Sequence, residues 1–143
     1  MKKVNLLILG NSSFVQKRVI SSLNKIKKIN YKICSKSQKN KNIFFSDYRE
    51  ALKSKPDIVY ISLVNHLHYK YAKIALNNGS HVIVDKPIAP ELSQVKDLIK
   101  IAKNKNLLLS EATLFNYHSV FRKINSLIGG NKKVRDFIYK WME

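Results

Sequence analysis

The chain alternates short apolar runs with amphipathic segments along its length, and this pattern restricts the fold more than any other feature. Val4–Leu9 is an almost continuous apolar run, which is typical of a strand covered on both faces. Residues 57–63 and 81–84 are further runs of this kind, and helical spacing of apolar residues marks the segments between them. Strands that alternate with helices predict βαβ units with right-handed crossovers. We therefore expect an α/β, Rossmann-type three-layer fold with a mainly parallel sheet.

Turn and capping residues set the boundaries of the expected elements. Asp47 precedes Glu50 by three residues, the spacing of a capping box, and Gly79 stands where a helix ends in a left-handed residue. Pro90 is expected in the first turn of the helix that follows. Further strands are expected at 31–34, 107–109 and 134–141, and helices at 14–27 and from about residue 119 to 128. Residues 1–130 are expected to form the Rossmann domain, and 131–143 the link or first strand of a second domain.

Three helices have apolar residues that define a predicted buried face. These residues are Val15, Val19, Leu23 and Ile26 in segment 14–27; Leu67, Tyr71, Ala72, Ala75 and Leu76 before Gly79; and Leu92, Val95, Leu98, Ile99 and Ala102 after Pro90. Residues three or four positions apart lie on the same side of an α-helix, so each set predicts a stripe that packs on the sheet.

Composition favours an ordinary soluble domain. Of the 143 residues, 45% are hydrophobic and 25% are charged. The single cysteine, Cys34, cannot form an internal disulfide, which fits a reducing compartment. The apolar run after Lys3 is shorter than a secretory signal core, and no stretch approaches the roughly 20 apolar residues of a membrane span. These observations predict a cytoplasmic protein without a membrane partner.

The formal net charge of +18 raises the alternative of nucleic-acid binding. The excess consists almost entirely of lysine, and the only arginines are Arg18, Arg49, Arg122 and Arg135. Arginine is the residue that reads phosphates and guanines in a bidentate manner, so a dispersed lysine excess is weaker evidence for recognition. The abundance of lysine, asparagine and isoleucine together indicates a compositional bias. Nucleic-acid binding is therefore the third of three hypotheses.

The turn after the first strand is the expected phosphate site, because ligands of such sheets bind beyond the carboxyl ends of the strands. It reads Gly10, Asn11, Ser12, Ser13, Phe14. Only the first glycine of a G-x-G-x-x-G template is present. Gly10 can make the tight turn, the Ser12 hydroxyl could donate to phosphate, and the helix N-terminus offers N–H groups to an anion. An ordinary strand–turn–helix without a ligand is the alternative for this segment.

The end of the second strand bears on the choice of cofactor. An NAD-dependent enzyme normally places Asp or Glu there, about 20 residues past the glycines, to bind the ribose hydroxyls. This chain has no acidic residue before Asp47, and Ser35 and Lys36 occupy the position. A hydroxyl followed by a cation suits a 2′-phosphate, so NADP is favoured over NAD. The alternative is that Lys36 is one more solvated lysine.

Two further turns carry polar residues that could take part in chemistry. Asn65 and His68 follow the strand at 57–63, and Asp85 and Lys86 follow the strand at 81–84. Lys86 could donate to a substrate oxygen as charge develops during hydride transfer. A surface ion pair and a packing histidine are the alternatives. No pair of histidines or cysteines has a convincing metal spacing, so no metal is expected.

In this order and spacing, the segments resemble the glucose–fructose oxidoreductase / inositol dehydrogenase (Gfo/Idh/MocA) family. Asn65 and His68 match the Pro-Asn-x-x-His turn of the family, although Val64 replaces the proline. Lys86 and Pro87 match its Glu-Lys-Pro motif, with Asp85 in place of the glutamate. The family's Ala-Leu-x-x-Gly-x-His-Val junction and its Glu-Ala segment correspond to residues 75–82 and 111–112.

The resemblance implies an NAD(P)-dependent oxidoreductase that acts on a sugar or sugar derivative. Lys86 would be the catalytic lysine beside the nicotinamide and the substrate. The cofactor contacts would come from Gly10, Asn11, Ser12, Ser13, Phe14, Ser35, Lys36, Asn65, His68, Asp85 and Lys86 itself. Family members are about twice as long, so the second α/β domain is expected to be missing and the chain to be a truncated, inactive half, either self-associating or completed by a separate C-terminal domain. A non-catalytic Rossmann binding or regulatory module is the second hypothesis.

Overall fold

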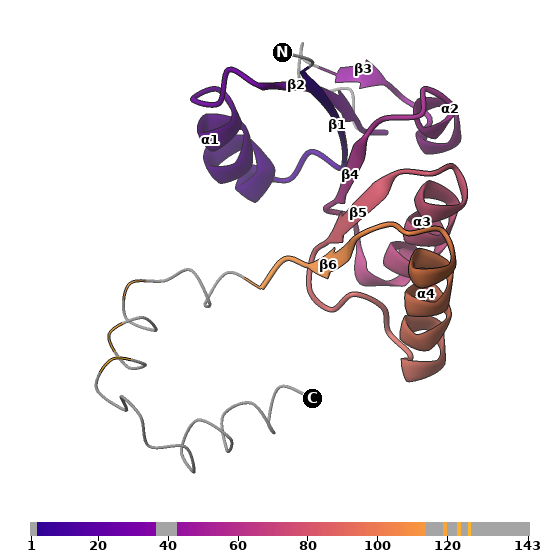
Figure 1. Ribbon diagram of the computed structural model, residues 1–143. Helices are drawn as coiled ribbons and strands as arrows, with labels where there is room; N and C mark the ends of the chain where they lie inside the picture. Colours follow the sequence, from indigo (N-terminus) through magenta and orange to yellow (C-terminus); the bar gives the residue numbers. More distant parts are fainter. Residues whose placement is uncertain (1–2, 37–42, 114–118, 120–122, 124–125, 127–143) are drawn as a thin grey trace. The chain divides into compact units, whose positions relative to one another are not determined.

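The structure, a computed structural model, describes residues 3–36 and 43–113 together with residues 119, 123 and 126 (Figure 1). Its centre is a six-stranded sheet of order β3-β2-β1-β4-β5-β6 in which every neighbouring pair is parallel. The strands are β1 (Val4–Leu9), β2 (Ile29–Cys34), β3 (Ile43–Phe45), β4 (Ile58–Ile61), β5 (His81–Val84) and β6 (Leu109–Glu111). This order is that of a Rossmann fold and confirms the predicted fold class.

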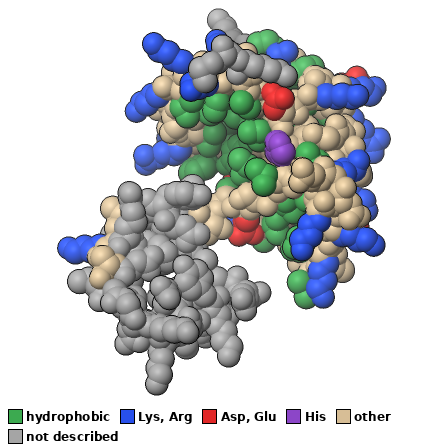
Figure 2. Space-filling view, in the orientation of Figure 1, with side chains coloured by type: hydrophobic (Ala, Val, Ile, Leu, Met, Phe, Trp, Pro, Cys, Tyr) green, Lys and Arg blue, Asp and Glu red, His purple; other side chains and the backbone are tan. Residues whose placement is uncertain are grey.

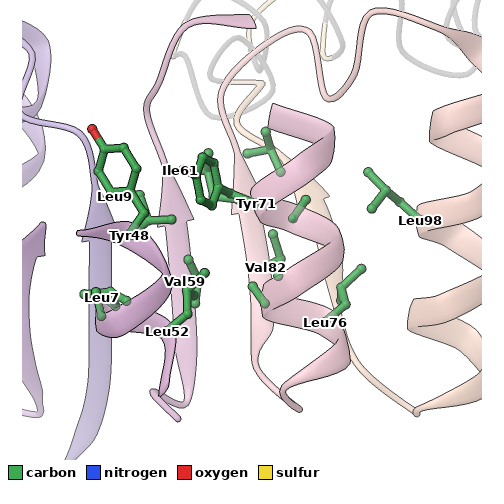
Figure 3. Packing of buried hydrophobic residues seen from close by; sticks show 14 of the residues in the cluster. Leu7, Leu9, Tyr48, Leu52, Val59, Ile61, Tyr71, Leu76, Val82 and Leu98 are labelled. Atoms are coloured by element: carbon green, nitrogen blue, oxygen red, sulfur yellow. The ribbon is translucent and has the colours of Figure 1, made fainter. Parts of the chain in front are cut away.

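Helices cover both faces of the sheet. They are η1 (Val15–Ile20), α1 (Ser21–Leu23), α2 (Tyr48–Lys53), α3 (Asn65–Asn77) and α4 (Leu92–Asn104). In Figure 1, α2, α3 and α4 lie on one face and α1 lies on the other. The larger buried cluster, shown in Figure 3, packs alternate strand residues such as Leu7, Val59 and Val82 against Leu76 and Leu98 of the helices. The intervening strand residues pack against Val15 and Ile20 on the opposite face.

The helix after β1 differs from the expected α-helix at 14–27. Its coil runs from residue 13 to residue 23, and the central part, η1, is π-helical. The wider π turn brings Ile20, five residues after Val15, onto the buried face, while Val19 and Leu23 are only partly buried. Ile26 lies beyond the end of the helix and is exposed, so its predicted inward position is wrong.

Helix α4 also departs from its prediction. α4 begins at Leu92 with Glu91 as N-cap, so Pro90 precedes the helix and does not lie in its first turn. Leu98 and Ala102 are buried as expected, but Leu92 is 68% exposed and Ile99 is 41% exposed. Leu92 is the first residue of the helix. Ile99 is rotated about 100° around the helix axis from the buried Leu98, which turns it away from the buried face.

Two other boundaries bear on the site. Asp47 is the N-cap of α2, where its Oδ1 accepts hydrogen bonds from the backbone N–H of Arg49 (2.8 Å) and of Glu50 (2.9 Å), as its spacing predicted. Glu50 instead accepts from Lys53 Nζ, so its side chain does not complete a capping box. The short edge strand β3 was not expected from the sequence.

The chain divides into two compact units, 1–112 and 113–143. The expected strand at 134–141, most of the expected helix at 119–128 and the expected domain boundary at 130 lie outside the described residues. Among the described residues, no helix is long and apolar enough to span a membrane. Figure 2 shows the described Lys and Arg side chains spread around the outline of the visible face, with hydrophobic side chains between them.

Candidate functional site

The carboxyl ends of β1 and β4 meet where the strand order reverses, which is where ligands bind in sheets of this type. Gly10 follows β1 directly and has a φ of +108°, which L side chains rarely adopt. Its N–H donates to the carbonyl oxygen of Cys34 over 2.9 Å. A Cβ on Gly10 would overlap the backbone carbonyl of Ser62, at the end of β4. Only glycine fits between these two strand ends, and the tight turn predicted at Gly10 is present.

The helix that begins at residue 13 points its N-terminal turn toward the same edge. The Ser12 hydroxyl accepts a hydrogen bond from the N–H of Val15 (3.2 Å), and the Ser12 carbonyl accepts from the N–H of Gln16 (3.1 Å). Gln16 Nε2 also donates to Asn11 Oδ1. Ser13 and Phe14 are exposed. Within the described residues, no hydrogen bond engages the N–H groups of Ser13 and Phe14, which remain available to an anion.

Ser35 and Lys36 directly follow β2, the strand beside β1 in the sheet. Ser35 is buried and its N–H donates to the carbonyl oxygen of Phe45 in β3 (3.0 Å). Lys36 is exposed, and its Nζ lies 5.9 Å from the centre of the Tyr48 ring. Asp47, the first acidic residue of the chain, is engaged as the cap of α2. This strand end therefore carries a hydroxyl and an ammonium group, while the nearby Asp47 carboxylate uses its Oδ1 to cap α2.

The turn after β4 leads into α3 and contains Asn65 and His68. Asn65 is exposed at the start of the helix, whereas His68 is 1% exposed. His68 Nδ1 lies 2.7 Å from the carbonyl oxygen of Pro87, and its Nε2 lies 2.9 Å from the carbonyl oxygen of Leu63. The ring thus joins the turn after β4 to the turn after β5. Both nitrogen atoms contact the backbone, so the ring's observed role is to join these turns.

The turn after β5 presents Lys86 at the surface. Asp85 accepts a hydrogen bond on Oδ1 from the Tyr60 hydroxyl of β4 (2.6 Å). Burial, and then the hydrogen bond to Asp85, raise the pKa of Tyr60 well above its usual value. The Lys86–Pro87 peptide bond is cis, and the N–H of Ile88 donates to Glu111 Oε2 of β6 over 2.8 Å.

The four predicted segments therefore lie on one edge of the sheet, after β1, β2, β4 and β5. Direct contacts join three of them, through Gly10 against Ser62 and through His68 against Pro87. Sequence reasoning assigned no role to Tyr60 or Glu111. A polar ring inside an otherwise aliphatic strand was the available signal for Tyr60. In the part of the chain that is described, no cluster of three or more His, Cys, Asp or Glu side chains could hold a metal ion.

The fold and this edge define a dinucleotide-binding Rossmann domain. The sequence model of the GFO_IDH_MocA family, described as an oxidoreductase family with an NAD-binding Rossmann fold, matches residues 11–113. The chain belongs to this family, as the sequence motifs indicated.

Individual relatives agree with this assignment. The uncharacterized oxidoreductase YhhX of Escherichia coli is 35% identical over 91 residues, which cover 62% of this chain and 26% of YhhX. The scyllo-inositol 2-dehydrogenase (NADP(+)) IolU of Bacillus subtilis is 32% identical over 94 residues, which cover 65% of this chain and 29% of IolU. A crystal structure of the oxidoreductase yhhX superposes with a TM-score of 0.80 at 26% identity and covers 90% of this chain and 41% of that one. The chain thus spans less than half the length of these relatives.

Proposed function

We propose that this chain supplies the cofactor-binding half of an NADP-dependent oxidoreductase that acts on a sugar or sugar derivative. The observation that carries the proposal is the shared edge at the switch point, where Gly10 packs against Ser62 and the exposed Lys86 follows the neighbouring strand β5. The similarity to IolU, whose name specifies NADP and an inositol, supports both the cofactor and the substrate class.

The residues at this edge fit a dinucleotide phosphate. The unengaged N–H groups of Ser13 and Phe14 and the hydroxyl of Ser12 would hold the pyrophosphate at the helix N-terminus. Ser35 and Lys36 would bind the 2′-phosphate, since an ammonium group and a hydroxyl are both suited to an anion. Asn65 and Asp85 would line the pocket closer to the substrate, and His68 would hold the two turns that carry them.

Lys86 would carry the acid–base chemistry. When bound, the nicotinamide cofactor exchanges a hydride with the substrate carbon. During reduction the Lys86 ammonium group would donate a proton to the substrate oxygen, and during oxidation the neutral amine would accept that proton. Other residues of the substrate pocket would lie outside this chain, because it covers only 26–29% of the sequences of YhhX and IolU.

Cofactor titration tests the binding half of the proposal. Binding to the protein should change the nicotinamide fluorescence of the reduced cofactor, and NADPH should reach half-saturation at a lower concentration than NADH. Lys36→Ala should weaken NADPH about tenfold, the effect of losing one hydrogen bond to a charged group, and should leave NADH unchanged. Lys32→Ala, which removes the same charge from an exposed position of β2, is the matched control. A preference for NADH would contradict the NADP assignment, and binding of neither cofactor would favour the non-catalytic module.

Turnover tests the chemical half. In a protein that joins this chain to the C-terminal domain of a relative, Lys86→Ala should lower turnover by roughly 10²–10⁴, with a much smaller change in cofactor affinity. Lys96→Ala, an exposed lysine on α4, is the control of equal charge change. Turnover that survives Lys86→Ala would show that the catalytic group lies elsewhere.

A further inference from the structure

We propose that Tyr60, His68 and Glu111 are positioning residues that together hold the segment 85–88 and so fix the place of Lys86. This inference rests on the proposed function, in which Lys86 is the proton donor. None of the three side chains belongs to the segment itself. Tyr60 comes from β4, His68 from α3 and Glu111 from β6, so the segment after β5 is held from three neighbouring elements.

The three contacts act on successive residues. The Tyr60 hydroxyl binds the side chain of Asp85 at 2.6 Å, the His68 ring contacts the carbonyl oxygen of Pro87 at 2.7 Å, and Glu111 accepts the N–H of Ile88 at 2.8 Å. In the described part of the chain, no hydrogen bond holds the side chain of Lys86. Both neighbours of Lys86 are anchored, while the Lys86 side chain itself is exposed.

Strand register explains why these residues reach the segment. Tyr60 is opposite Ile83, and Glu111 is opposite Val84, so both lie one or two residues before Asp85 along the sheet. Backbone hydrogen bonds between the strands continue up to the anchored segment. The Asp85 N–H donates to the carbonyl oxygen of Ile61 (2.9 Å), and the Ala112 N–H donates to the carbonyl oxygen of Val84 (2.8 Å). The strands on both sides of β5 thus end where the anchored segment begins.

This arrangement has a direct consequence for proton transfer. A proton donor must be held close to the reacting oxygen, and displacement by about 1 Å can lower the rate substantially. Both backbone motion and side-chain rotation change the position of an exposed lysine's ammonium group. The anchors on both sides of Lys86 restrict the backbone motion. Loss of one anchor should loosen the segment without unfolding the sheet, since the strand hydrogen bonds remain.

Hydrogen exchange in the 143-residue chain tests the anchoring itself. Tyr60→Phe and Glu111→Ala should each speed amide exchange of Asp85 and Ile88, whose N–H groups are hydrogen-bonded, about tenfold, which corresponds to about 1.4 kcal/mol. Glu111→Gln retains an acceptor oxygen and should restore slow exchange. Tyr69→Phe is the matched control, because it removes a comparable tyrosine–carboxylate hydrogen bond (Tyr69 to Asp97, 2.9 Å) between α3 and α4. Unchanged exchange at Asp85 and Ile88, or an equal rise throughout the sheet, would overturn the inference.

A double-mutant cycle tests whether the anchors act through Lys86. In the joined protein described above, Glu111→Ala should lower turnover about tenfold with little change in the KM for NADPH, and it should have no further effect when Lys86 is already alanine. Independent, multiplicative losses would contradict a positioning role. A joined protein that has no turnover but shows the localised exchange change would contradict the proposed function and leave the anchoring established, so the two failures are distinguishable.

Discussion

The turn after β1 and the turn after β5 are held in different ways, although both follow a buried strand at the same edge. The β1 turn depends on the backbone: Gly10 adopts a positive φ, donates to Cys34 and packs against the carbonyl of Ser62. The β5 turn depends on side chains from three other elements. A turn held by its backbone tolerates variation in the exposed residues that follow it. A turn held by side chains can be adjusted by residues distant in the sequence.

The sharpest way to break this comparison is to add a side chain at Gly10. Gly10→Ala should destabilise the domain by roughly 3 kcal/mol, because the positive φ and the overlap with the Ser62 backbone add together. Gly79→Ala is the matched control: its φ is +87°, but a Cβ there meets open space, so the loss should be about 1 kcal/mol. Urea denaturation measures both. Equal losses would show that the close approach at Ser62 contributes nothing.

The β5 turn should respond to a side chain far from it in sequence. His68→Leu replaces the buried ring with an apolar side chain, which leaves the carbonyl oxygens of Leu63 and Pro87 without their ring contacts. The free energy of unfolding should therefore fall by about 2 kcal/mol. His66→Leu, at an exposed position two residues earlier on the same helix, should change it by less than about 0.5 kcal/mol. If both variants unfold at the same urea concentration, the bridge between the two turns has no energetic role.

The same contrast explains what could be predicted from the sequence. The β1 turn was accessible because its sequence signal is local: an apolar strand directly followed by a glycine, even though Gly10 contacts Cys34 and Ser62 from distant parts of the chain. The alternation of strands and helices likewise fixed the parallel Rossmann sheet. The anchors of the β5 turn lie 19 to 25 residues from their partners. Periodicity shows which face a residue occupies, but not which residue of another strand stands opposite.

Local departures from ideal geometry were also hidden. A π turn in η1 shifts the buried face from Val19 to Ile20, and no propensity marks where it occurs. β3 has only three residues and pairs on one side, so its pattern is too short to separate from a loop. His68 was expected to contact the cofactor because it matched a motif. The structure shows the ring between two carbonyls, and direct contact with the cofactor stays a prediction.

Cys34 offers a probe for whether the two turns open independently. Its carbonyl accepts the N–H of Gly10, and its side chain is fully buried in the cluster that includes Tyr48 of α2. Burial, and then the charge of Asp47, raise the pKa of the thiol to about 12 from its ordinary 9.0. The unfolded thiol therefore ionises at lower pH than the folded one. Any stability that the protonated thiol contributes is present below pH 9 and lost as the pH rises through this window.

At pH 8 the folded thiol should react with a disulfide reagent only after local opening, so the rate reports the opening equilibrium. Asp47→Ala removes the cap of α2, which covers the thiol, and should raise the rate about fivefold. Asp47→Asn keeps a capping oxygen and should react like the wild type, which separates the cap from the charge.

Glu111→Ala loosens only the β5 turn and should leave the rate unchanged. Because opening exposes an ordinary thiol, the rate should rise about tenfold per pH unit below about pH 8 and level off above the ordinary thiol pKa. A faster reaction in Glu111→Ala would mean that the two turns open together. The backbone-held turn and the side-chain-held turn would then not open independently.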